Sequence, residues 1–174
     1  MARTARIAIS CPDRTGLVAA ITGRLFDLGA NLADTAFAVL GQGAEFTAVC
    51  DFPDTVDLAG VEADLRGLPD LAQADVSVRG FPLNPVHGES GHITHEIVVS
   101  GADRPGLIAR LCETLVGFRA NIVRLNSERI PGSDGSRYVV QIAVYIPPAS
   151  AAACLATISN TAQGLQLTCH WQVV

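Results

Sequence analysis

Residues 9–21 have the sequence ISCPDRTGLVAAI, and a close copy, VVSGADRPGLIAR, follows at residues 98–110. In each copy a short apolar run precedes Asp-Arg-x-Gly-Leu, and apolar residues at helical spacing follow it. The pentapeptide begins at Asp13 and again at Asp103, 90 residues later. A duplicated segment of strand, loop and helix therefore indicates that the chain contains two repeats.

The repeat extends well beyond the pentapeptide. At the same offset, core-type positions of the first copy coincide with core-type positions of the second: Ile7, Ile9, Leu17, Ile21, Leu25 and Leu28 with Ile97, Val99, Leu107, Leu111, Leu115 and Phe118. Beyond the next strand the offset becomes 94, which places four extra residues in the hairpin sequence RIPGSDGSR of the second copy. Agreement at spaced apolar positions is stronger evidence for a repeat than one shared pentapeptide.

Each copy predicts the same order of elements. Alternating apolar residues predict a first strand, and the 3- and 4-residue spacing that starts at Leu17 or Leu107 predicts an amphipathic helix. A hairpin of two strands is expected next, then a second helix and a final strand. The predicted ranges after the first helix are 32–40, 44–52, 55–66 and 76–78 in the first copy, and 122–129, 137–146, 149–161 and 167–174 in the second.

This order is βαββαβ, twice. The predicted fold class is α+β, with two tandem ferredoxin-like domains, each an antiparallel four-stranded sheet with its helices on one face. We expect the first domain at residues 1–80, a Pro- and Gly-rich linker at 81–91 and the second domain at 92–174. Gly29 is typical of a helix end, whereas Arg119 takes its place in the second copy, so we expect the two first helices to end differently.

Composition limits the function classes. Hydrophobic residues make up 49% and charged residues 17% of the chain, which favours a packed globular protein. The net charge is −5 and the twelve basic residues are scattered arginines, so we expect no direct binding of nucleic acid. Apolar runs are too short to span a bilayer, no secretory signal is recognised, and the five cysteines form no CxxC pair; these features favour a cytoplasmic protein with reduced thiols.

No motif of an enzyme is recognisable. The sequence has no nucleophile motif, no nucleotide-binding loop and no converging set of metal ligands. Cys11 precedes the first helix, where a thiolate could be stabilised, but a buried or half-buried thiol is the favoured interpretation. We therefore expect no catalytic residues, no cofactor and no metal.

The motif Asp-Arg-x-Gly-Leu between the first strand and first helix of a βαββαβ unit resembles the ACT domain family. The resemblance covers nearly the whole chain twice, and the second copy, with Pro105, matches the family pattern better than the first, which has Thr15. A pair of such domains without a catalytic partner is similar to a group of regulators of glycine cleavage. The resemblance implies that a small amino acid binds at an interface between ACT units, near the first loop and second strand, and that a partner protein is regulated.

The loop residues also have a physical reason to bind a zwitterion. A helix begins with unpaired N–H groups that suit a carboxylate, and a glycine there allows close approach. An aspartate at the loop can cap the helix or accept from a ligand ammonium, and an asparagine amide offers both donor and acceptor. The candidate ligand residues are Asp13, Arg14, Thr15, Gly16, Leu17 and Asn31 in the first copy, and Asp103, Arg104, Pro105, Gly106, Leu107 and Asn121 in the second.

Structural interpretations of the same residues stay open. The loop can be only a turn with a tightly packed glycine, and the leucines can belong to the core. The arginines can be solvated or form outward ion pairs, and asparagine is favoured after a helix for its backbone conformation alone. Since Thr15 and Cys11 of the first copy are Pro105 and Gly101 in the second, we expect any two sites to differ in affinity or ligand.

Two functions of different class follow. The first is a cytoplasmic, non-enzymatic sensor that binds a small amino acid, forms a homodimer through exposed sheet edges and controls a partner protein. The alternative is an interaction module that assembles without any ligand. Calorimetry against glycine, serine and other amino acids separates the two.

Overall fold

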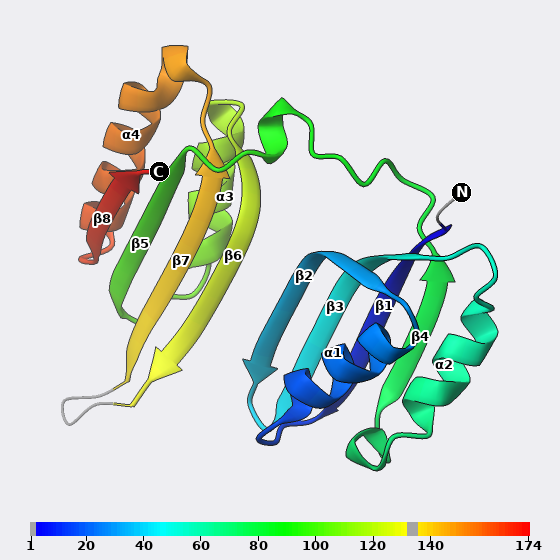
Figure 1. The fold of residues 1–174 in the computed structure, drawn as a ribbon. Coiled ribbons are helices and arrows are strands. Elements are labelled where there is room, and N and C mark those ends of the chain that lie inside the picture. Colours follow the sequence, from blue (N-terminus) through cyan, green and yellow to red (C-terminus); the bar gives the residue numbers. More distant parts are fainter. Residues whose placement is uncertain (1–2, 132–135) are drawn as a thin grey trace. The chain divides into compact units, whose positions relative to one another are not determined.

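The computed structural model describes residues 3–131 and 136–174. The chain divides into two compact units, Met1–Pro85 and Val86–Val174 (Figure 1). Each unit has its own hydrophobic core, so each is described separately. The inserted part of the second hairpin that the sequence predicts lies largely at 132–135, outside the described residues.

The first unit has the predicted order of elements. Its strands and helices are β1 (Arg3–Pro12), α1 (Leu17–Asp27), β2 (Asn31–Leu40), β3 (Gly43–Phe52), α2 (Leu58–Arg66), the short 3-10 helix η1 (Pro69–Leu71) and β4 (Asp75–Gly80). The second helix begins later than predicted because Asp57 caps it, accepting from the N–H groups of Ala59 and Gly60 at 3.4 and 3.1 Å.

The second unit repeats this order after one extra short helix. Its elements are η2 (Glu89–Gly91), β5 (His95–Ala102), α3 (Leu107–Gly117), β6 (Asn121–Ile130), β7 (Arg137–Tyr145), η3 (Pro148–Ser150), α4 (Ala151–Gly164) and β8 (Thr168–Val173). Part of the segment predicted as a linker packs here, because Tyr145 Oη donates to Glu89 at 2.9 Å. The boundaries proposed from the sequence stay a prediction.

Each unit contains one antiparallel four-stranded sheet. The strand orders are β2-β3-β1-β4 and β6-β7-β5-β8. Both sheets carry the same irregularity in their edge strand, between Leu32 and Thr35 in β2 and between Ile122 and Arg124 in β6. Figure 1 shows the helices of each unit on one side of its sheet. The predicted α+β class with two βαββαβ units is confirmed.

The cores follow the predicted periodicities. Ala5, Ile7 and Ile9 alternate along β1 and are buried beneath the helices, while Leu17 and Ile21 face them from α1. Burial of each such side chain contributes about 1.5–3 kcal/mol, so the two spacings fix which face of the strand and helix turns inward. The second unit repeats this pattern with its own core residues.

The first helix of each unit ends in the same way, contrary to our expectation. Gly29 has φ 79° and Arg119 has φ 57°, so both are left-handed. The N–H of the next residue bonds back to the helix in each case, from Ala30 to Leu25 at 2.9 Å and from Ala120 to Leu115 at 3.0 Å. The expectation is wrong because this closing turn is required in both units, and Arg119 adopts a conformation that glycine adopts without cost.

Candidate ligand-binding loops

The loop between β1 and α1 ends on a left-handed glycine. Gly16 has φ 88° and is the N-cap of α1. A Cβ at this position would meet no atom of any described residue within 4 Å. Gly106 has φ 77° at the start of α3 and is equally open. These glycines are therefore explained by backbone conformation and not by tight packing, and the space above them is free for a ligand.

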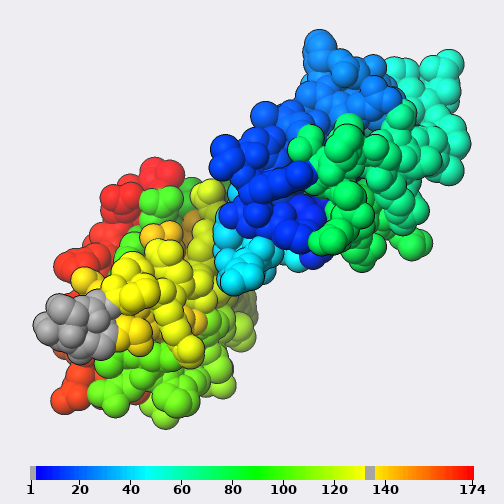
Figure 2. Space-filling model, turned by 90° about the horizontal axis from the view of Figure 1, so that it is seen from below, coloured from blue at the N-terminus to red at the C-terminus, as the bar shows by residue number. Residues whose placement is uncertain are grey.

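Of the two roles considered for the loop aspartates, helix capping is not observed in either loop. The N-cap is the glycine, so Asp13 and Asp103 lie three residues before the cap position. The Asp13 N–H instead donates to the Gln42 carbonyl at 2.9 Å, which joins the loop to the β2–β3 hairpin. Figure 2 shows the blue residues of this loop beside the light-blue residues of that hairpin.

Two backbone donors are exposed at the start of α1. The N–H of Leu17 reaches the Arg14 carbonyl at 3.4 Å, and the N–H of Ala20 reaches Gly16 at 2.9 Å. Between them, the N–H groups of Val18 and Ala19 have no acceptor in the described part of the chain. Unpaired N–H groups at a helix N-terminus carry partial positive charge and suit a carboxylate.

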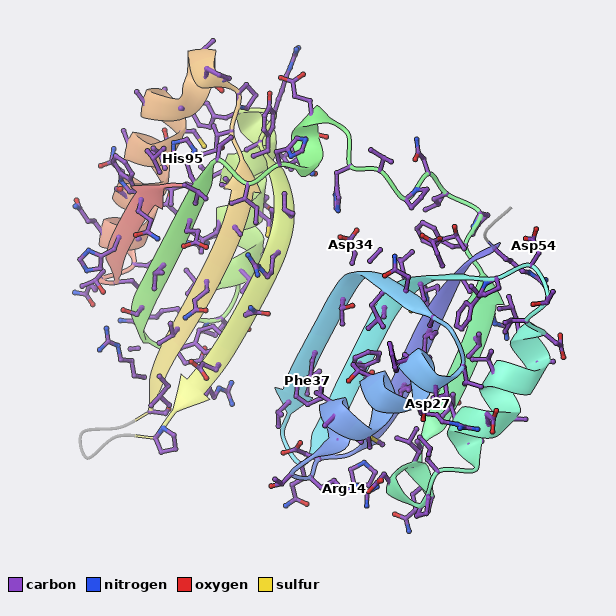
Figure 3. All side chains as sticks on the ribbon, viewed as in Figure 1. Arg14, Asp27, Asp34, Phe37, Asp54 and His95 are labelled. Atoms are coloured by element: carbon purple, nitrogen blue, oxygen red, sulfur yellow. The ribbon has the colours of Figure 1, made fainter. Side chains whose placement is uncertain are left out.

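A small hollow of about 260 Å³ opens over these donors. It is lined by one continuous segment, Asp13 to Ala19, and by Phe37 of β2. The Phe37 side chain lies on the helix side of the sheet, opposite Phe46, and is 41% exposed. Figure 3 shows Phe37 beside the first turn of α1. The sequence analysis missed Phe37, although its alternation with Thr35 and Val39 in an edge strand could have placed it on this face.

Three of the predicted loop residues have structural roles. Arg14 forms an ion pair with Asp70 of η1 at 2.8 Å, which fixes the loop to the neighbouring turn. Leu17 and Leu107 are each 2% exposed and belong to the cores, so they offer a ligand no side chain. Asp13 and Thr15 are exposed and line the hollow.

The second loop has the same backbone but different surroundings. Asp103 forms an ion pair with Arg129 of β6 at 2.6 Å. Arg104 donates a hydrogen bond to Gln166 Oε1 at 3.2 Å. Ser127 and Arg129 occupy the positions that Phe37 and Val39 occupy in the first unit. The carboxylate of the second loop is thus already paired, and Ser127 stands where the first unit has the Phe37 ring.

The structure does not bring Asn31 or Asn121 to the loop of its own unit. Asn31 pairs with Asp51, and Asp51 pairs with Thr4, at the beginning of β1. The loop follows the other end of β1. Eight strand residues separate Thr4 from that end, which corresponds to about 27 Å. Asn121 donates its Nδ2 to the Ser90 carbonyl at 2.8 Å. A contact with a ligand held by another unit stays a prediction.

Burial raises the pKa of the Cys11 thiol above its usual value, although Arg14 opposes the change. The Cys11 side chain is 8% exposed. A neutral thiol at neutral pH is a poor nucleophile, so this cysteine supports packing and not covalent chemistry. Across the described ranges no group of three His, Cys, Asp or Glu side chains could hold a metal ion.

The family model for the ACT domain matches residues 5–79, which include β1 to β4 and the open loop. The first unit is an ACT domain. The second unit repeats its topology strand for strand. No curated protein sequence matches the chain.

Two solved structures resemble the chain over its whole length. One is an unknown protein from Galdieria sulphuraria, with TM-score 0.78, 19% identity and coverage of 100% of this chain and 99% of that one. The other is described as a glycine cleavage system transcriptional repressor, with TM-score 0.69, 13% identity and coverage of 100% and 98%. At these identities the likeness shows the fold, with two βαββαβ units in tandem. Among the described residues, none of the helices has the length and apolar character needed to cross a bilayer.

Proposed function

We propose that the chain is a non-enzymatic regulator that binds a small amino acid at the first loop. The observation that carries the proposal is the hollow in which the unpaired N–H groups of Val18 and Ala19 lie near the exposed Asp13 carboxylate and Phe37. An α-amino acid has a carboxylate and an ammonium group close together. The carboxylate suits the helix donors, and the ammonium suits Asp13.

Glycine, alanine and serine are the first ligands to test, because each fits within the hollow of about 260 Å³. Phe37 provides an apolar wall beside the ligand, and Thr15 adds a hydroxyl and an N–H that Pro105 lacks in the second loop. The proposal therefore assigns ligand binding to the first unit, with the second unit weaker or inactive.

Regulation requires that the ligand favours one arrangement of the chain or its partner. The strand β2, which carries Phe37, is an edge strand whose outer backbone groups can pair with a second copy. Pairing along β2 would cover the hollow and complete the site at an interface. We propose a cytoplasmic homodimer that controls a partner protein, and the name of one structural neighbour makes transcriptional control of glycine breakdown the pathway to test first.

Titration calorimetry with glycine, alanine and serine tests ligand binding directly. Gly16→Asn places a side chain in the open space above Gly16, where the ligand would bind. Asparagine tolerates the left-handed backbone conformation with little strain, whereas a β-branched valine does not. The affinity is expected to fall at least about tenfold. Gly29→Asn is the matched control, because Gly29 has a similar φ of 79° but lies at the other end of α1. Equal loss in both variants would reject the loop as the site.

A ligand-independent interaction module is the second candidate. One observation favours it: Phe37, Val39 and Leu40 on the edge strand β2 are 41%, 50% and 63% exposed. Such an apolar edge suits assembly by itself. Flat calorimetric traces for every amino acid, together with a dimer in sedimentation that Val39→Lys disrupts, would favour this function over the first.

A further inference from the structure

The face of the second sheet that carries no helix has a row of four neighbouring side chains. The register pairs Gln172 of β8 with Glu96 of β5, Glu96 with Ala143 of β7, and Ala143 with Arg124 of β6. Directly paired residues of adjacent strands point to the same face. An acidic and a basic side chain therefore lie on either side of a single methyl group.

This row borders a hollow of about 300 Å³. Its floor is Ala143, which is 6% exposed, and Val98 adds apolar wall. The next row along the strands contributes two side-chain amides, from Gln141 and Asn126, which are paired with each other across β7 and β6. The hollow thus combines a small apolar floor with charges at two ends and neutral donors and acceptors at one side.

The two charges are held apart and are not paired with each other. Gln172 Nε2 donates to Oε2 of Glu96 at 2.8 Å, which orients the carboxylate and leaves its second oxygen available. Arg124 forms no ion pair with any residue that the structure describes. Two strand spacings place the backbones of Glu96 and Arg124 about 10 Å apart, so their side chains can lean toward a small molecule above Ala143.

The first unit shows what removes such a hollow. At the matching positions Val49 replaces Ala143 and Arg6 replaces Glu96, and Arg6 is paired with Arg79 in the register. The added methyl groups of Val49 occupy the floor. Strand β2 has Asp34 at the position of Arg124, so the acidic and basic positions are exchanged between the two units. The small floor, with the basic residue on the edge strand, belongs to the second unit.

We infer that this hollow binds a small zwitterion, with its carboxylate on Arg124 and its ammonium group on Glu96. A guanidinium binds a carboxylate through two parallel hydrogen bonds, and the free oxygen of Glu96 accepts from an ammonium group. The amides of Gln141 and Asn126 bind the remaining polar atoms of the ligand. The site is separate from the loop of the first unit and does not depend on ligand binding there.

The ligand class is an amino acid with little or no side chain. The small floor of Ala143 suits a ligand of small cross-section, and the distance between the two charged side chains favours zwitterions at least as long as glycine. Both charges of the site are partly solvated, so the affinity is expected to be weak and to decrease with salt.

The test is a titration of ¹⁵N-labelled Gly16→Asn protein, whose first loop is blocked, with glycine, β-alanine and 4-aminobutyrate. The side-chain signals of Gln141, Asn126 and Arg124 are followed by NMR. Saturable shifts are expected with at least one of these zwitterions. Acetate and ethylamine each carry only one of the two charges, so their dissociation constants should be about tenfold higher.

Ala143→Val transfers the floor residue of the first unit and should abolish the shifts while the sheet remains folded, since valine is favoured in strands. Arg124→Gln should do the same by removing the carboxylate partner. Val49→Ala is the matched control, because it changes the corresponding residue of the first sheet and should leave the shifts of Gln141, Asn126 and Arg124 unchanged.

Four outcomes would overturn the inference. They are the absence of shifts with all three zwitterions, shifts that persist in Ala143→Val, equal shifts with acetate alone, and shifts that depend only on protein concentration. The third would indicate a simple anion site, and the last would indicate self-association through the sheet face. None of them bears on the loop of the first unit, because that loop is already blocked in the protein used.

Discussion

The two loops that connect the first strand and helix of each unit have one backbone and two environments. Both end on a left-handed glycine and expose two helix N–H groups. The first loop faces Phe37, whereas in the second loop Arg129 pairs with Asp103. A duplicated motif therefore gives both loops the same backbone, while side chains of the neighbouring strand determine how open each candidate site is.

The same contrast extends to packing beside the loops. A Cβ at Gly101 would overlap Cδ2 of Leu167, which is 4% exposed in the core. In the first unit the corresponding residues are Cys11 and Ala74, so a larger residue on one strand is matched by a smaller one on the other. The space between these two strands is thus filled by a glycine and a leucine in the second unit, and by a cysteine and an alanine in the first.

Transfer of one residue between the units should break this match. Gly101→Cys is expected to destabilise the second unit by about 1–3 kcal/mol through overpacking. Trp171 is the single tryptophan and lies in β8, so its fluorescence during urea unfolding reports on this unit. Adding Leu167→Ala should make the double variant more stable than the sum of the two single effects predicts. Strict additivity would show that the two positions are independent.

Removal of the aromatic wall should make the first loop resemble the second. Phe37→Ser is expected to lower the affinity for the best amino acid about tenfold, because apolar contact with the ligand is lost. The converse double variant, Ser127→Phe with Arg129→Val, should give the second loop measurable binding by calorimetry. Unchanged affinity in Phe37→Ser would place the ligand elsewhere.

Exchange of the residues at the ends of α1 and α3 should change stability by a smaller amount, with opposite sign in the two units. Arg119→Gly should stabilise the second unit by about 1 kcal/mol, because Arg119 is left-handed. Gly29→Arg should destabilise the first unit by a similar amount. The first unit contains no Trp or Tyr, so its unfolding is monitored by far-UV circular dichroism. Destabilisation by Arg119→Gly would mean that the arginine side chain contributes more than its backbone conformation costs.

The ion pair over the second loop should affect stability least. Arg129 and Asp103 side chains are 70% and 35% exposed, and such pairs contribute about 0–1 kcal/mol. Arg129→Val is therefore expected to change urea unfolding only slightly, and the difference should shrink in high salt. A larger, salt-insensitive loss would indicate that the arginine stabilises the unit by packing.

The sequence predicted the elements and cores well, because Leu17, Ile21 and Ile7 have spacings that only one face of a helix or strand can satisfy. The arrangement of the candidate site residues was less predictable. Capping by aspartate, one of two roles considered, does not occur because the glycine itself takes the cap position. The direction of β2 carries Asn31 to the end of the sheet away from the loop of its own unit. Phe37 and Arg129 become relevant only through strand register.

We propose that the first loop binds an amino acid and that the second loop binds it more weakly or not at all. The direct measurement is an NMR titration of the ¹⁵N-labelled chain with the amino acid that binds most tightly, which compares the backbone amides of Val18 and Ala19 with those of Ile108 and Ala109. We expect saturable shifts in the first pair, their loss in Gly16→Asn and their retention in Gly106→Asn. Equal shifts and equal affinity in both pairs, or shifts that survive in Gly16→Asn, would contradict it.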